Sequence, residues 1–147
     1  MPRIRPLASL LVVLLAALPA VGAGPPNITI TDAWIRAVPG SAVAAAYFDA
    51  RNNGSQPLTI VGIRSSAAAN AMIHESTLVG TRSTMRVHEQ LSLPPGQTVH
   101  LSPGGMHVML VDLRQPLRPG DEVQLVLLFE GGASRAITAR VRALEAQ

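Results

Sequence analysis

Short apolar segments recur along the chain and are separated by clusters of turn-forming residues, such as Pro94-Pro95-Gly96 and Pro119-Gly120-Asp121. Turn residues at this fairly regular spacing are typical of an antiparallel β-sandwich or barrel. We therefore predict an all-β chain. The predicted strands are Ile28–Thr31, Ala33–Ala37, Val43–Arg51, Leu58–Ser65, Ala71–Ser76, Thr84–Gln90, Thr98–Leu101, His107–Leu113, Glu122–Phe129 and Arg135–Arg142.

One of these segments carries a conflict between pattern and propensity. The alanines of Val43–Arg51 favour helix on intrinsic propensity alone, whereas the neighbouring turn signals favour a strand. No internal repeat, linker or composition shift divides the sequence. We expect a single domain.

The N-terminal residues resemble an export signal. Two arginines precede an apolar run over Leu7–Leu18, and Val21 and Ala23 occupy the small-residue positions of a cleavage site. We expect cleavage after Ala23, with Ala20 as the alternative, and a mature domain over 24–147. The apolar run is about a dozen residues, short of the roughly 20 needed to span a bilayer, so we expect a soluble periplasmic protein.

Charge and cysteine content exclude several function classes. All twelve basic residues are arginine, two of them in the expected signal, so the high pI of 11.0 hides a mature charge near neutral. The arginines are scattered, which argues against nucleic-acid binding. The absence of cysteine excludes disulfides, thiolate zinc sites, a thiolate nucleophile and a blue-copper centre.

Histidine and methionine are concentrated in one window. All four histidines, and every methionine except Met1, lie between Met72 and Met109. Imidazole nitrogen with thioether sulfur, in the absence of thiols, suits a soft ion such as Cu(I). The sequence therefore predicts a copper site.

Strand periodicity places these side chains in pairs. Residues two apart on a strand share a face, so His107 and Met109 point the same way, as do Met72 and His74. His74 and Met85 lie on either side of a turn near Gly80. A Val79-Gly80 loop would make them direct cross-strand partners, a Gly80-Thr81 loop would make them diagonal neighbours, and a three-residue loop would separate them.

The spacing of four of these residues resembles a known signature. His74, ten residues, Met85, twenty-one residues, His107, one residue and Met109 is similar to the copper-binding motif of the PCuAC family of periplasmic copper(I) chaperones. The stretch Leu101–Leu110 resembles the most distinctive part of that family. Further similarity lies in Ala33–Ala37, in Ala45–Tyr47 with Asn52 after it, and in Pro116–Asp121 leading to Leu128–Glu130.

This resemblance implies a cupredoxin-like Greek-key β-sandwich that holds Cu(I) near its surface through His74, Met85, His107 and Met109. It also implies delivery of copper to the dinuclear copper centre of cytochrome c oxidase, alongside Sco-type thiol proteins. We expect the protein to be a monomer. Some members carry a His- and Met-rich C-terminal tail for Cu(II). Because this sequence ends Ala143–Gln147 without such residues, we do not expect a second copper site.

The remaining His and Met residues are assigned ordinary roles. We expect His88 to face away from Met85 and to be exposed, and His100 to be a neighbouring polar residue. Met72 and Met106 are expected to fill gaps in the core. Because Met72 shares the face of His74, a substitute-ligand or supporting role stays open for it.

Carboxylates and aromatics near the window do not indicate an enzyme. Glu75 faces away from His74 by parity, and Glu89 lies roughly 13 Å along the strand from Met85, so both are expected to be solvated. Trp34 is expected in the core. Two other functions stay open: copper sequestration without a dedicated acceptor, and a metal-free β-sandwich interaction module.

Overall fold

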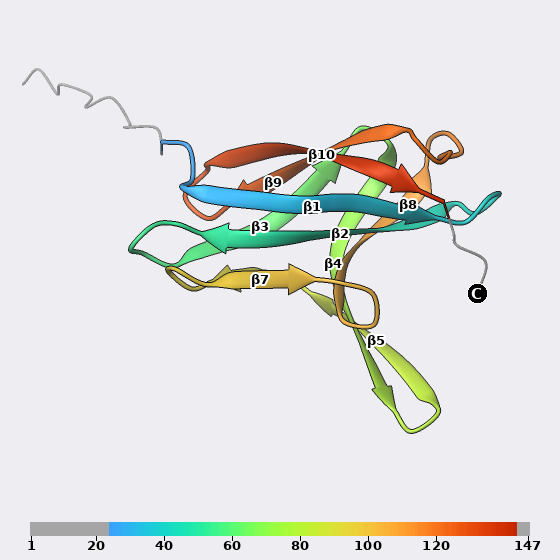
Figure 1. Ribbon diagram of the computed structural model, residues 1–147, viewed down its shortest axis with the longest axis horizontal. Helices are drawn as coiled ribbons and strands as arrows, with labels where there is room; N and C mark the ends of the chain where they lie inside the picture. Colours follow the sequence, from blue (N-terminus) through green and yellow to red (C-terminus); the bar gives the residue numbers. More distant parts are fainter. Residues whose placement is uncertain (1–23, 144–147) are drawn as a thin grey trace, which may run out of the picture.

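The computed structural model describes residues 24–143, so the export signal expected over 1–23 and the last four residues lie outside it. The described residues form ten strands and no helix, which confirms the all-β fold class (Figure 1). None of them forms a helix that could cross a membrane. The strands are β1 Ile28–Ala37, β2 Val43–Asn52, β3 Leu58–Ser65, β4 Ala68–Val79, β5 Arg82–His88, β6 Leu91–Leu93, β7 Thr98–Leu101, β8 Met106–Leu113, β9 Glu122–Phe129 and β10 Ser134–Arg142.

The strands form one hydrogen-bonded sheet that folds over into a sandwich. Its order is β5-β4-β8-β2-β1-β10-β9-β3-β6. The remaining strand, β7, pairs with the C-terminal half of β2, whereas β8 pairs with its N-terminal half. β1 and β10 are parallel, and the other pairs are antiparallel. β3 crosses behind β1 and β2 and packs against β4 (Figure 1). The inner faces of all these layers contribute to a single apolar core.

Burial explains the strand with high alanine content. Ala44, Ala46 and Ala50 of β2 are each at most 4% exposed and alternate with residues on the outer face. Packing against the opposite layer needs small side chains at these positions and overrides helix propensity. The strand prediction for this segment is therefore confirmed, and the helical alternative is wrong.

The first two predicted strands are one strand interrupted by a bulge. Register with β2 shifts between Thr31 and Trp34, and Asp32 adopts a positive φ of 50°. A bulge inserts an unpaired residue without ending the strand. The sequence pattern showed this irregularity as a break at Asp32.

The β4–β5 hairpin differs most from the predicted boundaries. β4 is twice as long as the predicted Ala71–Ser76. The predicted Thr84–Gln90 starts two residues too late and ends two residues too late, because β5 is Arg82–His88, and the short β6 that follows was not predicted. Residues up to Glu75 pair with β8, but from Thr77 onward β4 pairs with β5 alone. The hairpin consequently projects from the body of the sandwich (Figure 1).

Candidate metal site

The two candidate histidines face each other across neighbouring strands. His74 on β4 is the direct antiparallel partner of His107 on β8, and Met72 is the partner of Met109 in the next outward-facing position. Because residues two apart share a face, all four side chains lie on the outer face of the sheet. The centroids of the two imidazole rings are 5.8 Å apart.

The hairpin brings a second sulfur to the same face. Val79 pairs with Arg82, so the loop is Gly80-Thr81, and His74 and Met85 are diagonal neighbours, as expected for that loop. Gly80 has a φ of 62°, which suits the first loop position of a type II′ turn. Sδ of Met85 lies 3.0 Å from Nδ1 of His74.

A tight turn before β8 orients His107. In Ser102-Pro103-Gly104-Gly105, Gly104 has a φ of 82° and the Gly105 amide donates to the Ser102 carbonyl, as in a type II turn. The Gly105 carbonyl then accepts hydrogen bonds from Nδ1 of His107 at 3.1 Å and from the amide of Ser76. Since Nδ1 of His107 carries the proton, the lone pair is on Nε2, the nitrogen available to a metal ion.

His74 carries an unpaired buried nitrogen. Its Nε2 is buried and has no hydrogen-bond partner among the described residues. Burial, followed by the nearby His107, lowers the pKa of His74 below its usual value and favours the neutral imidazole. A neutral imidazole with an unused nitrogen beside a thioether can bind a soft metal ion without first losing a proton.

The methionines differ in exposure. Met109 is half-buried, whereas Met85 is 53% exposed and Met72 is 38% exposed. The prediction that Met72 fills the core is wrong, because its side chain lies on the outer face opposite Met109. Met106 packs against the core as expected. Three of the four methionine sulfurs within residues 24–143 therefore lie on the face that carries His74 and His107.

His88 and Glu75 occupy the reverse face of the hairpin. Oε2 of Glu75 is 2.9 Å from Nε2 of His88 and 2.9 Å from a guanidinium nitrogen of Arg86. These bonds, His88 first, lower the pKa of Glu75. His88 faces away from Met85 as predicted but is half-buried and bonded rather than exposed, and Glu75 is not simply solvated. The sequence left the register of β4 against β5 open, so it did not predict that Glu75 and His88 meet.

His100 bonds a carboxylate elsewhere on the outer face. Its Nδ1 lies 2.8 Å from Oδ1 of Asp49, its cross-strand partner on β2. Within residues 24–143, no three His, Asp or Glu side chains are grouped so that they could hold a metal ion.

An aromatic row beside the site was not found by sequence reasoning. The ring centroids of Tyr47 and His107 are 6.3 Å apart, and those of Trp34 and Tyr47 are 4.6 Å apart. Trp34 is therefore not a core residue as predicted but lies half-buried on the outer face, with the Arg142 guanidinium 4.7 Å from its ring centroid. Burial raises the pKa of Tyr47. The alternation of inward and outward side chains along the two strands could have placed Trp34 and Tyr47 on the same face.

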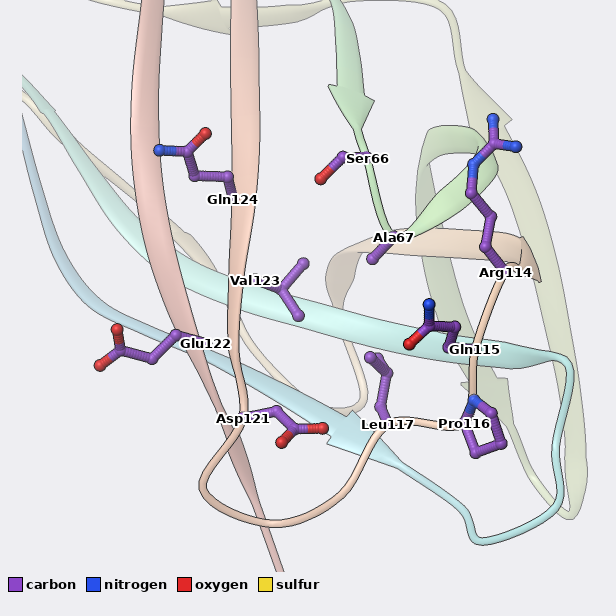
Figure 2. A pocket seen from close by; sticks show the side chains of 10 residues that line it. All are labelled: Ser66, Ala67, Arg114, Gln115, Pro116, Leu117, Asp121, Glu122, Val123 and Gln124. Carbon is purple, nitrogen blue, oxygen red and sulfur yellow. The ribbon is translucent and has the colours of Figure 1, made fainter.

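A separate cleft of about 440 Å³ lies between Ser66-Ala67 and the segment 114–117 (Figure 2). None of the four predicted ligands lines it. Of its two carboxylates, Asp121 accepts the Arg118 amide and Glu122 pairs with Arg140. Both carboxylates therefore bond to neighbouring parts of the protein that form the wall of the cleft.

Comparison with known proteins identifies the family. Residues 28–141 match the family described as "Putative lipoprotein LpqE-like", which is nearly the whole described domain. The chain belongs to the LpqE-like family. It is 34% identical over 117 residues to "Putative lipoprotein Lxx21020" of Leifsonia xyli, covering 79% of this chain and 70% of the relative. It is 25% identical over 99 residues to the uncharacterised protein RP573 of Rickettsia prowazekii, of which it spans 55%.

Solved structures with the same fold belong to copper-binding domains. The copper-bound PCuAC domain from PmoF2 matches with a TM-score of 0.67 and 26% identity, over 83% of this chain and 97% of that domain. The Cu(I) form of DR1885 from Deinococcus radiodurans matches with a TM-score of 0.62 and 29% identity, over 84% of this chain and 81% of that protein. The fold of this LpqE-like protein is thus that of PCuAC domains.

Proposed function

We propose that this protein is a Cu(I) carrier that holds the ion with His74, Met85, His107 and Met109. The observation that carries the proposal is that two imidazoles share one sheet face with the thioethers of Met85 and Met109, and with that of Met72, while the buried Nε2 of His74 has no partner within residues 24–143. The copper-bound and Cu(I)-bound structures of similar fold support the choice of ion. Neutral sulfur ligands favour Cu(I) and need no deprotonation.

The same ligand set suits transfer rather than catalysis. Met85 is exposed, so an acceptor's thiol or imidazole can reach the ion and replace the donors one at a time. Glu75, the carboxylate next to His74 in the sequence, is on the reverse face and bonded to Arg86 and His88, so it is not free to act as a general base at the site. We therefore propose a carrier and not an enzyme.

The proposed destination is the dinuclear copper centre of cytochrome c oxidase, with Sco-type thiol proteins as further partners. Export to the periplasm and cleavage near Ala23 belong to the same proposal, and the lipoprotein descriptions of the family support export. The 147 residues contain no cysteine, so they offer no residue for the lipid attachment that this description implies.

The test begins with metal binding. Purified protein, loaded anaerobically and competed against a chromogenic Cu(I) chelator, should bind one Cu(I), with Ag(I) as a surrogate. Zn(II) should compete poorly, because it gains little from thioether sulfur. Equal competition by Zn(II) would contradict a soft site, and no metal binding at all would favour an interaction module.

Transfer distinguishes a carrier from a sequestering protein. The loaded protein is mixed with the apo soluble copper-centre domain of an oxidase subunit, and the copper content of each is measured after separation. A carrier should deliver its ion to that domain. A protein that keeps Cu(I) while the domain stays apo would be a sequestering protein.

A further inference from the structure

A row of side chains links the candidate ligands to two arginines. Across successive strands, Met72 pairs with Met109, Met109 with Ala45, Ala45 with Arg36, and Arg36 with Arg142. Neighbouring strands lie about 4.8 Å apart, so Arg36 is roughly 10 Å from Met109 along this row. All five residues face outward on the same surface.

The adjacent row is a continuous set of rings. His74, His107, Tyr47 and Trp34 follow one another with centroid separations of 5.8, 6.3 and 4.6 Å. The Arg142 guanidinium lies over the last ring, 4.7 Å from its centroid. The surface between the metal site and the arginines is therefore covered by packed rings and the small side chain of Ala45.

The charges on this face are not balanced within the domain. Arg36 and Arg142 are exposed and form no ion pair among residues 24–143, whereas Arg86 and Arg140 are paired with Glu75 and Glu122. The two like charges are direct cross-strand neighbours and repel each other, so the favourable contact of Arg142 with Trp34 is offset in part by this repulsion.

The opposite side of the site is apolar. Met72, Met85 and Val87 are 38%, 53% and 54% exposed. His74 pairs with Val87 and lies diagonal to Met85, so these side chains adjoin the candidate ligands directly. A positive edge and an apolar centre on one face form a pattern suited to protein association.

We propose that this face docks an acidic protein acceptor, whose carboxylates pair with Arg36 and Arg142 while its apolar contact covers the hairpin side of the site. The proposal rests on the carrier function above and adds the chemistry of the partner. Opposite charge steers the encounter and fixes which way the acceptor approaches the ion.

The bound ion itself strengthens this steering. Two imidazoles and two thioethers are neutral, so a bound Cu(I) adds its positive charge to that of Arg36 and Arg142. After transfer this charge has left the face, and the attraction for an acidic acceptor is weaker. The loaded carrier is thus drawn to its acceptor more strongly than the empty one, which favours delivery and then release.

The test compares two synthetic acceptor peptides with the same Cys-x-x-Cys dithiol, one flanked by four glutamates and the other by four glutamines. In the transfer step, Cu(I) leaves the carrier's nitrogen and sulfur donors and binds two thiolates, whose protons go to the buffer. No electron is moved. Transfer is followed anaerobically by stopped flow at low and high ionic strength.

We expect transfer to the acidic peptide to be at least about tenfold faster at low ionic strength, with the difference shrinking in salt. The Arg36→Gln/Arg142→Gln variant should lose most of this difference, keeping only the part due to the charge of the bound Cu(I), while binding Cu(I) as tightly as before. The matched control, Arg64→Gln/Arg118→Gln, removes the same charge from other exposed positions and should keep it. Arg36→Gln alone leaves the contact of Arg142 with Trp34 intact. If this single variant also reduces the difference between the peptides, loss of that contact is not the cause.

Equal rates for the two peptides in the wild-type protein, or equal losses in the two double variants, would overturn the docking proposal. Equal peptide rates together with arginine-dependent binding to phosphatidylglycerol vesicles would assign the arginines to a membrane surface instead. Failure of the wild-type protein to bind Cu(I), or to transfer it to either peptide, would contradict the carrier function itself.

Discussion

The two faces of the β4–β5 hairpin use the same strands for opposite purposes. On the front, Nε2 of His74 is buried without a hydrogen-bond partner in the described part of the chain, and its Nδ1 lies beside the sulfur of Met85. On the back, Nε2 of His88 lies 2.9 Å from the Glu75 carboxylate, which also binds Arg86. Adjacent residues thus alternate between a satisfied polar cluster and an unsatisfied one.

This difference separates structural histidines from candidate ligands. A buried polar group without a partner is unfavourable in the free protein, so its presence indicates a site completed by something else. The polar groups of the back face satisfy one another and fix the register of β5 on β4. Substitutions on the unsatisfied front face are therefore expected to change Cu(I) affinity strongly. Substitutions on the back face are expected to change it little.

The largest expected effect is loss of copper binding from the front face. His74→Ala, His107→Ala, Met85→Leu and Met109→Leu should each weaken Cu(I) binding at least tenfold, about 1.4 kcal/mol or more. His74, Met85 and Met109 are at least partly exposed, so the apo fold should persist in their variants, whereas His107 is buried and bonded to the Gly105 carbonyl, so His107→Ala should also lower the apo melting temperature. Anaerobic chelator competition measures the affinity, and apo thermal melts check the folding.

The control is the matching histidine on the back. His88→Ala removes an imidazole from the same hairpin and should leave Cu(I) affinity nearly unchanged, as should His100→Ala, which removes the partner of Asp49. Losses spread evenly over all six variants would contradict the assignment of the ligands to one face.

The next effect is on pH dependence. Histidine must be neutral to bind, and His74 has a lowered pKa, so protons should compete with Cu(I) there only below the usual value of about 6.5. Affinity should fall as the pH drops through roughly 6 to 5. Chelator competition across this range should show the same profile in the His88→Ala variant, whereas a flat profile in the wild type would exclude histidine ligands.

The same shift affects the apo protein. A histidine whose folded pKa is lowered favours the folded state fully above its unfolded pKa, and this contribution is lost as the pH falls toward the folded pKa. The apo melting temperature should therefore decrease below about pH 6.5. This decrease should be smaller in a His74→Ala variant, because that variant has no imidazole to protonate at the position.

A smaller effect is expected from breaking the back cluster. Glu75→Gln removes the charge that holds Arg86 and His88, so β5 should be held less firmly on β4 and Met85 less firmly beside His74. Because exposed ion pairs contribute little, we expect Cu(I) release to be faster by only roughly two- to threefold. Stopped-flow release measures this rate. A tenfold or larger change would show that the back face is part of the site.

The sequence predicted those features that depend on the alternation of side chains along a strand and on local turn residues. The bounds of β3, β7 and β9 and the shared face of His107 and Met109 follow from these rules, and the structure confirms them. The bulge at Asp32 appeared only as a break, because a pattern cannot distinguish an inserted residue from a strand end.

What the sequence could not determine depends on register and on backbone atoms. Three loop geometries were open for the β4–β5 turn, and only the Gly80-Thr81 loop places Glu75 opposite Arg86 and within reach of His88. The acceptor that orients His107 is the Gly105 carbonyl, which no side-chain pattern reveals. Met72 was assigned to the core because methionine commonly fills gaps there, but its exposure depends on which face of β4 the opposite layer covers.

The smallest expected effect concerns the two methionines outside the proposed ligand set. Met72→Leu and Met106→Leu are close in volume, so each should cost less than about 1.5 kcal/mol of stability and leave Cu(I) affinity nearly unchanged. Of the two, Met106→Leu should lower the melting temperature more, because Met106 packs against the core whereas Met72 is exposed. Thermal melts and chelator competition on both variants give these values.

Met72 makes this comparison sensitive, since its sulfur is on the ligand face opposite Met109. If Met72 can replace a missing sulfur, Met109→Leu alone will lose less affinity than Met85→Leu, and adding Met72→Leu to Met109→Leu will cause a further large loss. If only the proposed four residues bind, Met72→Leu will add little loss of Cu(I) affinity in either background, because leucine keeps about the volume of a side chain that donates nothing to the ion. A double-mutant cycle on Met72 and Met109 therefore decides whether the front face holds two working sulfurs or three.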